Sequence, residues 1–207
     1  MKMKRFIGGP VSTCMYLVCE GADAVIIDPA YFDEDMLRII KEEGLTLHGY
    51  LLTHAHFDHT MGMSDYFDLL GGSAYVGEAD ADMLYCPEKD ASMAFGLRYT
   101  QNSVPDRICV KEGDELKLGE LFFRVIGTPG HTAGGVCYYN EKEKALFSGD
   151  TLFRSGFGRT DLYSGSYEDL MKSITEKLMK LDDDTSVFPG HGGATTIGRE
   201  KRMYGLA

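Results

Sequence analysis

The stretch Thr53-His54-Ala55-His56-Phe57-Asp58-His59 places three histidines and an aspartate close together in the chain. The apolar run Tyr50-Leu51-Leu52 precedes it and predicts a buried strand over about residues 48–52. Alternate side chains of an extended backbone point the same way, so positions 54, 56 and 58 share one face. The start of a following helix would turn His59 toward a second position. Imidazole and carboxylate groups suit zinc, and also iron or manganese, so the stretch predicts a metal site at a strand end.

Three later segments repeat this layout, in which an apolar stretch ends in small residues and one ligand-type side chain. They are Thr128-Pro129-Gly130-His131-Thr132, Phe147-Ser148-Gly149-Asp150-Thr151 and Phe188-Pro189-Gly190-His191-Gly192. Together with the first stretch they supply five histidines and two aspartates, which suits two metal ions that share a carboxylate. A structural zinc site would favour cysteine ligands, and none of the four segments contains a cysteine.

We assign these side chains to two metal positions. The first position takes His54, His56 and His131. The second takes Asp58, His59 and His191, and Asp150 bridges the two. His48, upstream of the strand, matches no ligand pattern and is assigned a structural role.

The composition is that of one globular domain with an apolar core. The chain has 207 residues, of which 43% are hydrophobic and 26% are charged, and no segment has the composition of a linker. We therefore expect a single domain over residues 1–207. The net charge of −11 argues against binding to nucleic acid or to an anionic membrane surface, because both attract clustered lysine and arginine.

Targeting signals and cysteine usage favour a cytoplasmic protein. No apolar run approaches the ~20 residues of a membrane span. The apolar segment behind the basic start, residues 1–5, is too short for a signal peptide. The cysteines at positions 14, 19, 86, 109 and 137 lack C-x-x-C spacing and lie in or beside apolar segments. We expect reduced core cysteines rather than disulfides. The sequence leaves the oligomeric state open.

The hydrophobic periodicity predicts two groups of strands, each followed by helices. The predicted strands cover residues 12–19, 24–27, 48–52, 73–77, 121–126, 135–139, 145–147 and 185–188. The predicted helices cover residues 33–43, a segment after His59 that ends near Leu70, residues 166–180, and a short segment after Thr196. Two half-sheets with helices outside each would bury the apolar strands between helical layers, which is an α/β architecture.

Residues 78–105 interrupt this rhythm with prolines and scattered methionine and tyrosine. We expect the segment to be irregular or short-helical and treat it as a candidate lid or substrate wall. Met83, Met93 and Phe95 could line a pocket there, but core packing is the expected role, since methionine fills irregular gaps readily.

The four ligand-bearing segments, in this order, resemble the successive motifs of the metallo-β-lactamase superfamily, and the resemblance covers nearly the whole chain. It implies a four-layered αββα sandwich in a single domain, with two divalent metals at one edge. The ligand roles assigned above are also those that the resemblance implies. Zinc is the first choice of metal, with iron or manganese as alternatives.

Residues 153–162 and 188–198 resemble the compact glyoxalase II-like branch, the hydroxyacylglutathione hydrolase-like proteins. This resemblance implies a thioesterase that converts an S-2-hydroxyacylglutathione or similar thioester and water into a hydroxyacid and a thiol. The chain departs from the larger members in two ways. It ends 16 residues after His191, without their C-terminal helical domain, and Gly193 stands near where they carry a tyrosine. Both departures concern the glutathione carrier rather than the metals.

The expected mechanism uses a hydroxide that bridges the two metals and attacks the thioester carbonyl. The thiolate leaves with little help, because an ordinary thiol has a pKa of about 8.5. Asp58 is the catalytic residue that we expect to orient the hydroxide, a role the resemblance implies. Arg159 is the candidate contact for a substrate carboxylate, and Asp161 the candidate partner that orients a ligand or Arg159. The expected partner is a small-molecule thioester.

Other branches of the superfamily share some of these residues. The segment Gly158-Arg159-Thr160-Asp161 also resembles the persulfide dioxygenases, which hold a single iron through two histidines and an aspartate. A mononuclear iron persulfide dioxygenase is therefore the alternative function. Class B β-lactamases fit less well, since they usually carry a cysteine where Asp150 stands and are exported. Flavodiiron proteins usually carry a glutamate in place of His56, and the nucleases are generally longer.

Overall fold

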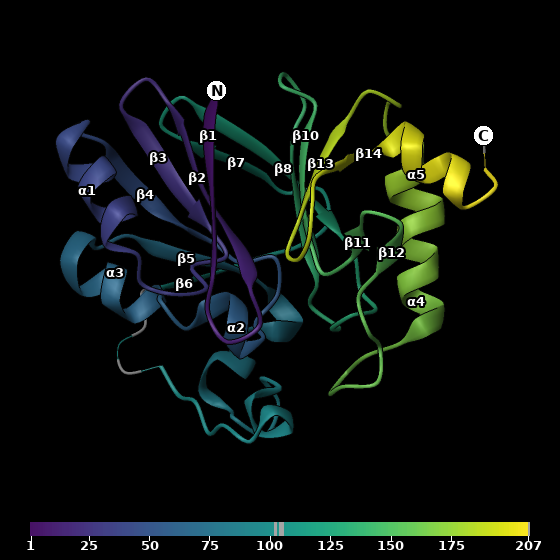
Figure 1. The fold of residues 1–207 in the computed structure, drawn as a ribbon, viewed down its shortest axis with the longest axis horizontal. Coiled ribbons are helices and arrows are strands. Elements are labelled where there is room, and N and C mark those ends of the chain that lie inside the picture. Colours follow the sequence, from purple (N-terminus) through teal and green to yellow (C-terminus); the bar gives the residue numbers. More distant parts are fainter. Residues whose placement is uncertain (102, 104–105, 207) are drawn as a thin grey trace.

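Two mixed sheets face each other in the computed structural model, which describes residues 1–101, 103 and 106–206 (Figure 1). The first sheet has the strand order β1 (Lys2–Gly8), β2 (Thr13–Glu20), β3 (Asp23–Ile27), β4 (Thr46–Leu51), β5 (Ser73–Gly77) and β6 (Arg107–Val110). The second has the order β14 (Thr195–Thr196), β13 (Ser186–Pro189), β10 (Ala145–Gly149), β9 (Val136–Asn140), β8 (Leu121–Gly127) and β7 (Glu115–Leu118). A small hairpin joins β11 (Leu152–Phe153) to β12 (Gly156–Phe157).

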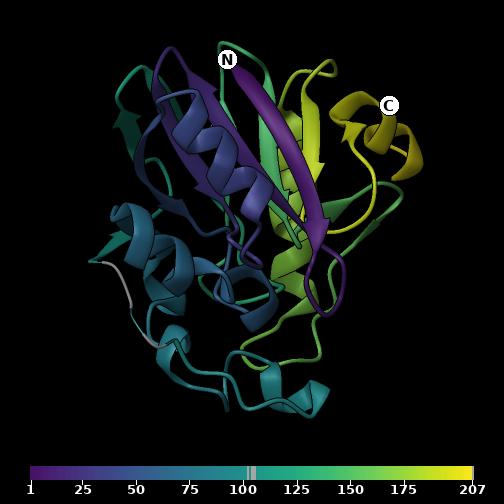
Figure 2. The same ribbon diagram turned by 60° about the vertical axis from the view of Figure 1, so that its left-hand side comes forward.

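Helices cover the outer face of each sheet. On the first sheet lie α1 (Glu34–Glu42) and α3 (Met63–Leu70), and the single turn α2 (Phe57–Thr60) precedes α3. On the second lie α4 (Tyr167–Lys172) and α5 (Ile197–Met203), on the side of the molecule away from α1 (Figures 1 and 2). The Asp33 side chain begins α1 by accepting a hydrogen bond from the Met36 backbone N–H at 2.9 Å.

Three apolar layers hold the fold together. The middle layer lies between the sheets and contains Tyr16, Phe123 and Phe147, all of which are buried. One outer layer lies beneath α1 and α3, and the other lies beneath α4 and α5. Strands covered on both faces appear in sequence as continuous apolar runs, as in β2 and β3. The expected αββα sandwich is confirmed.

The predicted strands and helices all occur, with shifts at their ends. The predicted helix over residues 166–180 is regular only to Lys172 and continues as a π-helical turn, Ser173–Lys177, and a 3₁₀ turn, Leu178–Lys180. The sequence did not predict the two-residue strands β11, β12 and β14, nor the longer strands β1, β6 and β7. The last three are edge strands, where one or both faces of a strand stay open to solvent and the apolar pattern is weak.

Residues 78–101 form the irregular segment that the sequence predicts. It contains three 3₁₀ turns, Glu78–Asp80, Met83–Tyr85 and Ser92–Phe95, and it lies at the same end of the sheets as α2 (Figure 1). Met83 packs in the core as expected. The same expectation is wrong for Met93 and Phe95, which are 51% and 47% exposed. Residues 102, 104 and 105, which fall in the predicted wall segment, lie outside the described residues.

Within the described part of the chain, the helices are all too short or too polar to cross a bilayer.

Candidate metal centre

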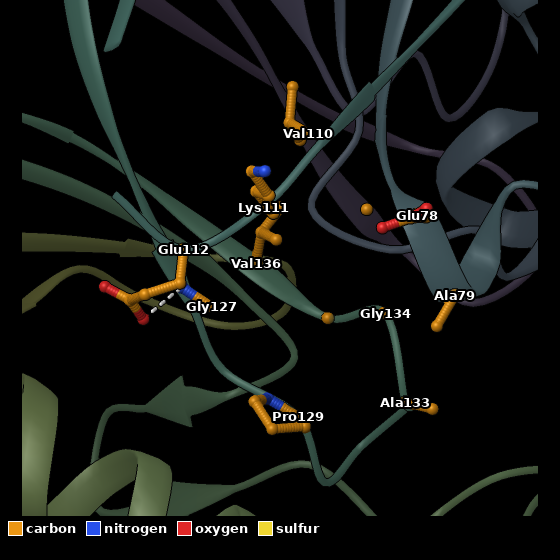
Figure 3. A pocket seen from close by; sticks show the side chains of 12 residues that line it. Glu78, Ala79, Val110, Lys111, Glu112, Gly127, Pro129, Ala133, Gly134 and Val136 are labelled. Carbon is orange, nitrogen blue, oxygen red and sulfur yellow. Dashed lines mark hydrogen bonds between the residues drawn. The ribbon is translucent and has the colours of Figure 1, made fainter. Parts of the chain in front are cut away.

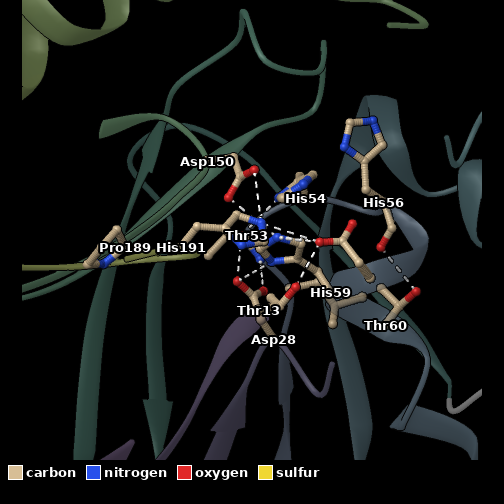
Figure 4. A network of polar contacts seen from close by, with 12 residues as sticks. Thr13, Asp28, Thr53, His54, His56, His59, Thr60, Asp150, Pro189 and His191 are labelled. Carbon is tan, nitrogen blue, oxygen red and sulfur yellow. Dashed lines mark hydrogen bonds and ion pairs between the residues drawn. The ribbon is translucent and has the colours of Figure 1, made fainter. Parts of the chain in front are cut away.

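The predicted ligands come together at one edge of the sandwich, each from the end of a different strand. The stretch 54–59 follows β4, and His131 lies in the loop after β8. Asp150 directly follows β10, and His191 comes two residues after β13. Since β4 belongs to one sheet and the other three strands to the second, the site forms only when the sheets pack face to face. Figure 4 shows the resulting network of side chains.

The ligand atoms contain the two groups that the sequence assigns, linked by a third set that consists of His54, His59 and Asp150. His54, His56 and His131 form one group, and Asp58, His59 and His191 form the other. In each group the ligand atoms all lie within 4.8 Å of one another. We call these the first and the second ligand group.

Asp150 faces both groups. Its Oδ1 lies 3.4 Å from His59 Nε2, and its Oδ2 lies 3.6 Å from His131 Nε2 and 3.5 Å from His191 Nε2. A carboxylate in this place can serve ions in both groups, which is the bridging position assigned from sequence. The individual ligand roles stay predictions, and the geometry agrees with them.

Hydrogen bonds on the far side of three imidazole rings orient them. The Nδ1 of His59 lies 2.9 Å from Asp28 Oδ2, and the Nδ1 of His131 lies 2.7 Å from the Arg159 carbonyl. The Nδ1 of His54 lies 3.1 Å from Thr53 Oγ1. Such contacts leave Nε2 of each ring free to bind a metal and fix the direction in which it points.

The unpartnered atoms of the site fit metal binding. Among the described residues, the buried side-chain atoms without a hydrogen-bond partner include Nε2 of His54, His56 and His59 and Oδ1 of Asp150. His56 turns Nδ1 toward His131 Nε2, at 3.0 Å. Buried polar groups left unpaired cost free energy, so a site with several of them calls for a ligand. Two nitrogen-rich groups joined by a carboxylate fit two divalent metals, and leave the choice between zinc and iron open.

The protonation states of His54, His56 and Asp150 suit a cation, whereas the surrounding carboxylates outweigh burial and raise the pKa of His59 and His191, which would have to lose a proton to bind a metal. Burial, together with the neighbouring histidines, holds the pKa of His54 well below its usual range and lowers that of His56 to about 3, so both rings are neutral. Burial raises the pKa of Asp150, but His59 and its fellow histidines outweigh it and lower the pKa, so the carboxylate is ionised. Neutral imidazoles and ionised carboxylates are the forms that bind metals.

Glycines stand beside the ligands because the backbone at these positions lies too close to neighbouring side chains to leave room for a Cβ. A Cβ on Gly190 would overlap the Asp150 carboxylate and the His59 ring. A Cβ on Gly149, which has a φ of 47°, would overlap Thr53. The small residues that end each apolar stretch therefore let ligands from both sheets meet.

Three buried polar residues that support the site escaped the sequence analysis. Asp28 accepts hydrogen bonds from the Thr53 backbone N–H and hydroxyl, both at 2.7 Å, as well as contacting His59. Thr13 donates its hydroxyl to Asp58 Oδ2 at 2.8 Å. Asp80 is fully buried among the loops around the first ligand group. One signal was available for Asp28: it ends an apolar strand beside Pro29, as the ligands end theirs.

A pocket opens beside the ligands, and its wall is largely apolar. Besides His56, Asp58, His131, Asp150 and His191, the residues that line it are Val11, Ala91, Phe95, Phe153, Gly158, Arg159 and Leu162. The segment 78–105 thus contributes part of the wall through Ala91 and Phe95. Arg159 lies in the pocket lining as its predicted substrate role requires. Its guanidinium donates two hydrogen bonds to the Asp161 carboxylate, both at 2.7 Å, which confirms the expected pairing.

The remaining histidine, His48, and the cysteines lie outside the ligand groups. His48 pairs with Asp23 on β3 and takes no part in the ligand groups, in agreement with its structural assignment. The described cysteines are all free thiols. Cys14, Cys19 and Cys137 are buried as expected, but Cys109 is exposed and Cys86 is half-buried, so the core expectation is wrong for these two. Cys109 lies on the edge strand β6, where one side of the strand faces solvent.

Comparison with known proteins gives matches over nearly the whole chain. The family model described as the metallo-beta-lactamase superfamily matches residues 8–191. The hydroxyacylglutathione hydrolase GloC of Haemophilus influenzae is 36% identical over 189 residues, which cover 91% of this chain and 89% of GloC.

Two solved structures are similar in both fold and sequence. The crystal structure of the B3 metallo-β-lactamase BLEG-1 has a TM-score of 0.91 and 37% identity, with 97% of each chain covered. The protein TTHA1623, solved in a di-iron-bound form, has a TM-score of 0.86 and 34% identity, with 97% of this chain and 98% of its own covered. BLEG-1 is described as a B3 β-lactamase, so similarity in fold and sequence extends to a branch whose usual residues match this chain less well.

Proposed function

The chain belongs to the metallo-β-lactamase superfamily, and from that premise we propose that it is a metal-dependent hydrolase of the glyoxalase II type. Its substrate would be an S-2-hydroxyacylglutathione or a similar small thioester, and its products a hydroxyacid and a thiol. One observation carries the proposal. The two ligand groups meet at Asp150, which lines a single pocket. Metals bound by both groups would therefore face the same substrate carbonyl.

Two divalent metals held by these ligands would supply an activated water near neutral pH and a positive charge for the carbonyl oxygen. The protein's own residues set the conditions for this chemistry. Thr13 holds the Asp58 carboxylate by a hydrogen bond, so one carboxylate oxygen is fixed beside the pocket. Burial opposes the ionised form of Asp58, but His59 and His191 outweigh it, so its pKa lies well below its usual range. An ionised, oriented carboxylate is suited to accept a hydrogen bond from the attacking water.

The pocket walls are suited to holding an uncharged stretch of substrate. Phe95, Phe153 and Leu162 offer apolar surface, and Arg159 offers a cation near the ligands. The fork of Arg159 is already engaged by Asp161, so a substrate carboxylate would meet a guanidinium fixed in one orientation. A thiolate is a good leaving group. Apart from the ligands, the described residues that line the pocket include no general acid, which matches a thioester better than an amide.

The test is a hydrolysis panel on metal-analysed protein. The substrates are S-D-lactoylglutathione, a cephalosporin and a phosphodiester, and oxygen uptake with glutathione persulfide is measured in parallel. We expect the thioester to give the highest kcat/KM. Asp150→Asn should abolish this hydrolysis and reduce the metal content, because it removes the carboxylate that faces both groups. A fully active, metal-replete Asp150→Asn protein overturns the assignment of the site.

The other arms separate the competing functions. Oxygen consumption with one bound iron and no thioester hydrolysis would establish the persulfide dioxygenase instead. A preference for the cephalosporin would establish a β-lactamase, the activity named for BLEG-1.

A further inference from the structure

Asp80 is a buried carboxylate that has no charged partner among the residues the structure describes. It is the last residue of the 3₁₀ turn Glu78–Asp80 that follows β5, and its exposed fraction is zero. Within the described residues it takes part in no ion pair. A lone buried carboxylate is costly unless several hydrogen bonds compensate it, so its presence calls for a role.

The hydrogen bonds of Asp80 connect the two segments that supply the first ligand group. Its Oδ2 accepts from the Ala55 backbone N–H at 3.3 Å and from the Thr132 hydroxyl at 2.6 Å. Its Oδ1 accepts from the Gly134 backbone N–H at 2.7 Å. Ala55 separates His54 from His56, and Thr132 directly follows His131. One side chain therefore links the backbones that carry all three ligands.

The contact between these segments is tight as well as polar. The turn that contains Glu78 and Ala79 runs beside the loop that contains Ala133 and Gly134, at the edge of a cavity (Figure 3). A Cβ on Gly77 would overlap the Gly134 carbonyl, and a Cβ on Gly134 would overlap the backbone of Asp80. The packing leaves Asp80 little freedom, so the position of the carboxylate fixes the loop of His131 relative to the stretch 54–56.

The second ligand group is held by different residues. His59 is oriented by Asp28, and Asp58 by Thr13. None of the hydrogen bonds of Asp80 reaches Asp58, His59 or His191. Asp80 thus supports the first group alone, whereas Asp28 contacts His59 of the second group directly and reaches His54 of the first through Thr53.

We propose that Asp80 is a positioning residue for one of the two metal positions. It aligns His54, His56 and His131 through Ala55, Thr132 and Gly134, and so controls metal affinity at the first ligand group while leaving the second unchanged. The inference rests on metal binding by the chain and not on the thioesterase activity. Changes to groups that orient metal ligands typically weaken affinity by about 10–100-fold, which sets the expected size of the effect.

Asp80→Asn is the sharpest variant. It keeps the volume and an acceptor oxygen for Gly134, and the Thr132 hydroxyl can rotate to accept from the new amide. The amide NH₂ cannot accept from the Ala55 N–H, so two donors would face each other there. The link to the stretch 54–56 is lost, and the rest of the structure keeps its packing.

The experiment measures Zn²⁺ affinity of apo protein by calorimetry in two backgrounds that each keep one ligand group. His191→Ala disables the second group, and His131→Ala disables the first. We expect Asp80→Asn to weaken Zn²⁺ binding by about 10–100-fold in the His191→Ala background and by less than about twofold in the His131→Ala background. Co²⁺ spectra in the visible range report the ligand geometry of the same proteins independently of activity.

Two further variants keep the test decisive. Asp90→Asn is the matched control, because Asp90 is also buried in segment 78–101 but its side chain accepts from the Ser92 N–H and not from a ligand loop. It should leave Zn²⁺ affinity unchanged in both backgrounds. Should Asp80→Asn fail to fold, Thr132→Val removes one of the same hydrogen bonds and should give a smaller loss in the same background only. An equal loss in both backgrounds, or no loss in either, overturns the proposal. Thioesterase failure would leave these affinities unaffected.

Discussion

Asp28 and His59 form a buried pair in which Asp28 Oδ2 lies 2.9 Å from His59 Nδ1, and the same oxygen accepts the Thr53 hydroxyl at 2.7 Å. Burial lowers the pKa of His59, but Asp58, Asp28 and Asp150 outweigh it and raise the pKa well above its usual value. In the metal-bound protein, Asp28 would keep the proton of the neutral ring on Nδ1 and leave Nε2 available. The pair therefore decides which nitrogen of His59 can bind a metal.

Asp28→Asn should change which nitrogen of the neutral His59 ring carries the proton. The amide would donate to Nδ1, so the proton of the neutral ring would move to Nε2, where a metal has to bind. We expect Zn²⁺ affinity at the second ligand group to fall about 10–100-fold, measured by calorimetry in the His131→Ala background. Asp23→Asn is the matched control, since Asp23 pairs with His48 away from the site. Equal affinities for Asp28→Asn and the control would contradict the tautomer argument.

Metal removal should destabilise the protein. Ligands that bind only the folded state stabilise it, by about 2.7 kcal/mol at a metal concentration 100 times Kd. For a chain of this length the corresponding rise in Tm is about 5–10 °C. We expect Zn²⁺ added to chelator-treated protein to give such a rise in a thermal scan, and Mg²⁺ to give none, because Mg²⁺ prefers oxygen ligands. A Tm that does not respond to Zn²⁺ would be inconsistent with the site.

Phe95→Ala should weaken substrate binding. Phe95 lines the pocket and is 47% exposed without substrate, so a bound acyl or thiol group can cover it. Losing about 1 kcal/mol of apolar contact would lower kcat/KM about fivefold, mainly through KM. Met93→Ala is the control, because Met93 belongs to the same 3₁₀ turn and is 51% exposed but does not line the pocket. Steady-state kinetics of both variants on one thioester give the change in kcat/KM. Equal changes in Phe95→Ala and Met93→Ala would argue against a substrate contact of Phe95.

Arg159→Ala should raise KM for S-D-lactoylglutathione about tenfold with little change in kcat, if the guanidinium contacts a substrate carboxylate. Arg159→Lys keeps the charge but loses the fork and should recover only part of the affinity. Hydrogen bonds from Arg159 lower the pKa of Asp161 to about 2. This carboxylate is therefore protonated only below that pH, and the pair should leave KM flat between pH 5 and pH 9. An unchanged KM in Arg159→Ala would remove the residue from the substrate site.

The cysteines should differ sharply in reactivity. The thiolate is the reactive form, and burial raises the pKa of Cys137 to about 12, so at pH 8.5 the side chain is an unreactive, inaccessible thiol. Cys109 is exposed on an edge strand. Brief treatment of native protein with iodoacetamide, followed by peptide mass spectrometry, should label Cys109 first, Cys86 more slowly and Cys137 only after denaturation. Labelling of Cys137 at the rate of Cys109 would show that the core opens readily.

Sequence alone determined the ligand types and the elements that present them. The stretch 54–59 places four ligands after an apolar run, and the segments around His131, Asp150 and His191 each join an apolar run to small residues and one ligand. That local pattern can be recognised from the sequence alone. The helix around Met36 can likewise be predicted from sequence, because its apolar residues recur at helical spacing. Edge strands such as β1 cannot be predicted in this way, since their exposed residues give no strong hydrophobic pattern.

Only the tertiary structure decided which polar residues support the site. Asp80 looks like an ordinary turn residue in sequence, and Asp28 shows only that it ends an apolar strand. The partners of both lie 25 to 54 positions away. Their roles depend on how the loops of two sheets pack together, and a pattern of neighbours along the chain carries no information about that. The same holds for Phe95, whose place in the pocket wall follows from where segment 78–101 lies against the ligands. The local sequence pattern identifies the ligands, and packing between distant segments determines how those ligands are oriented.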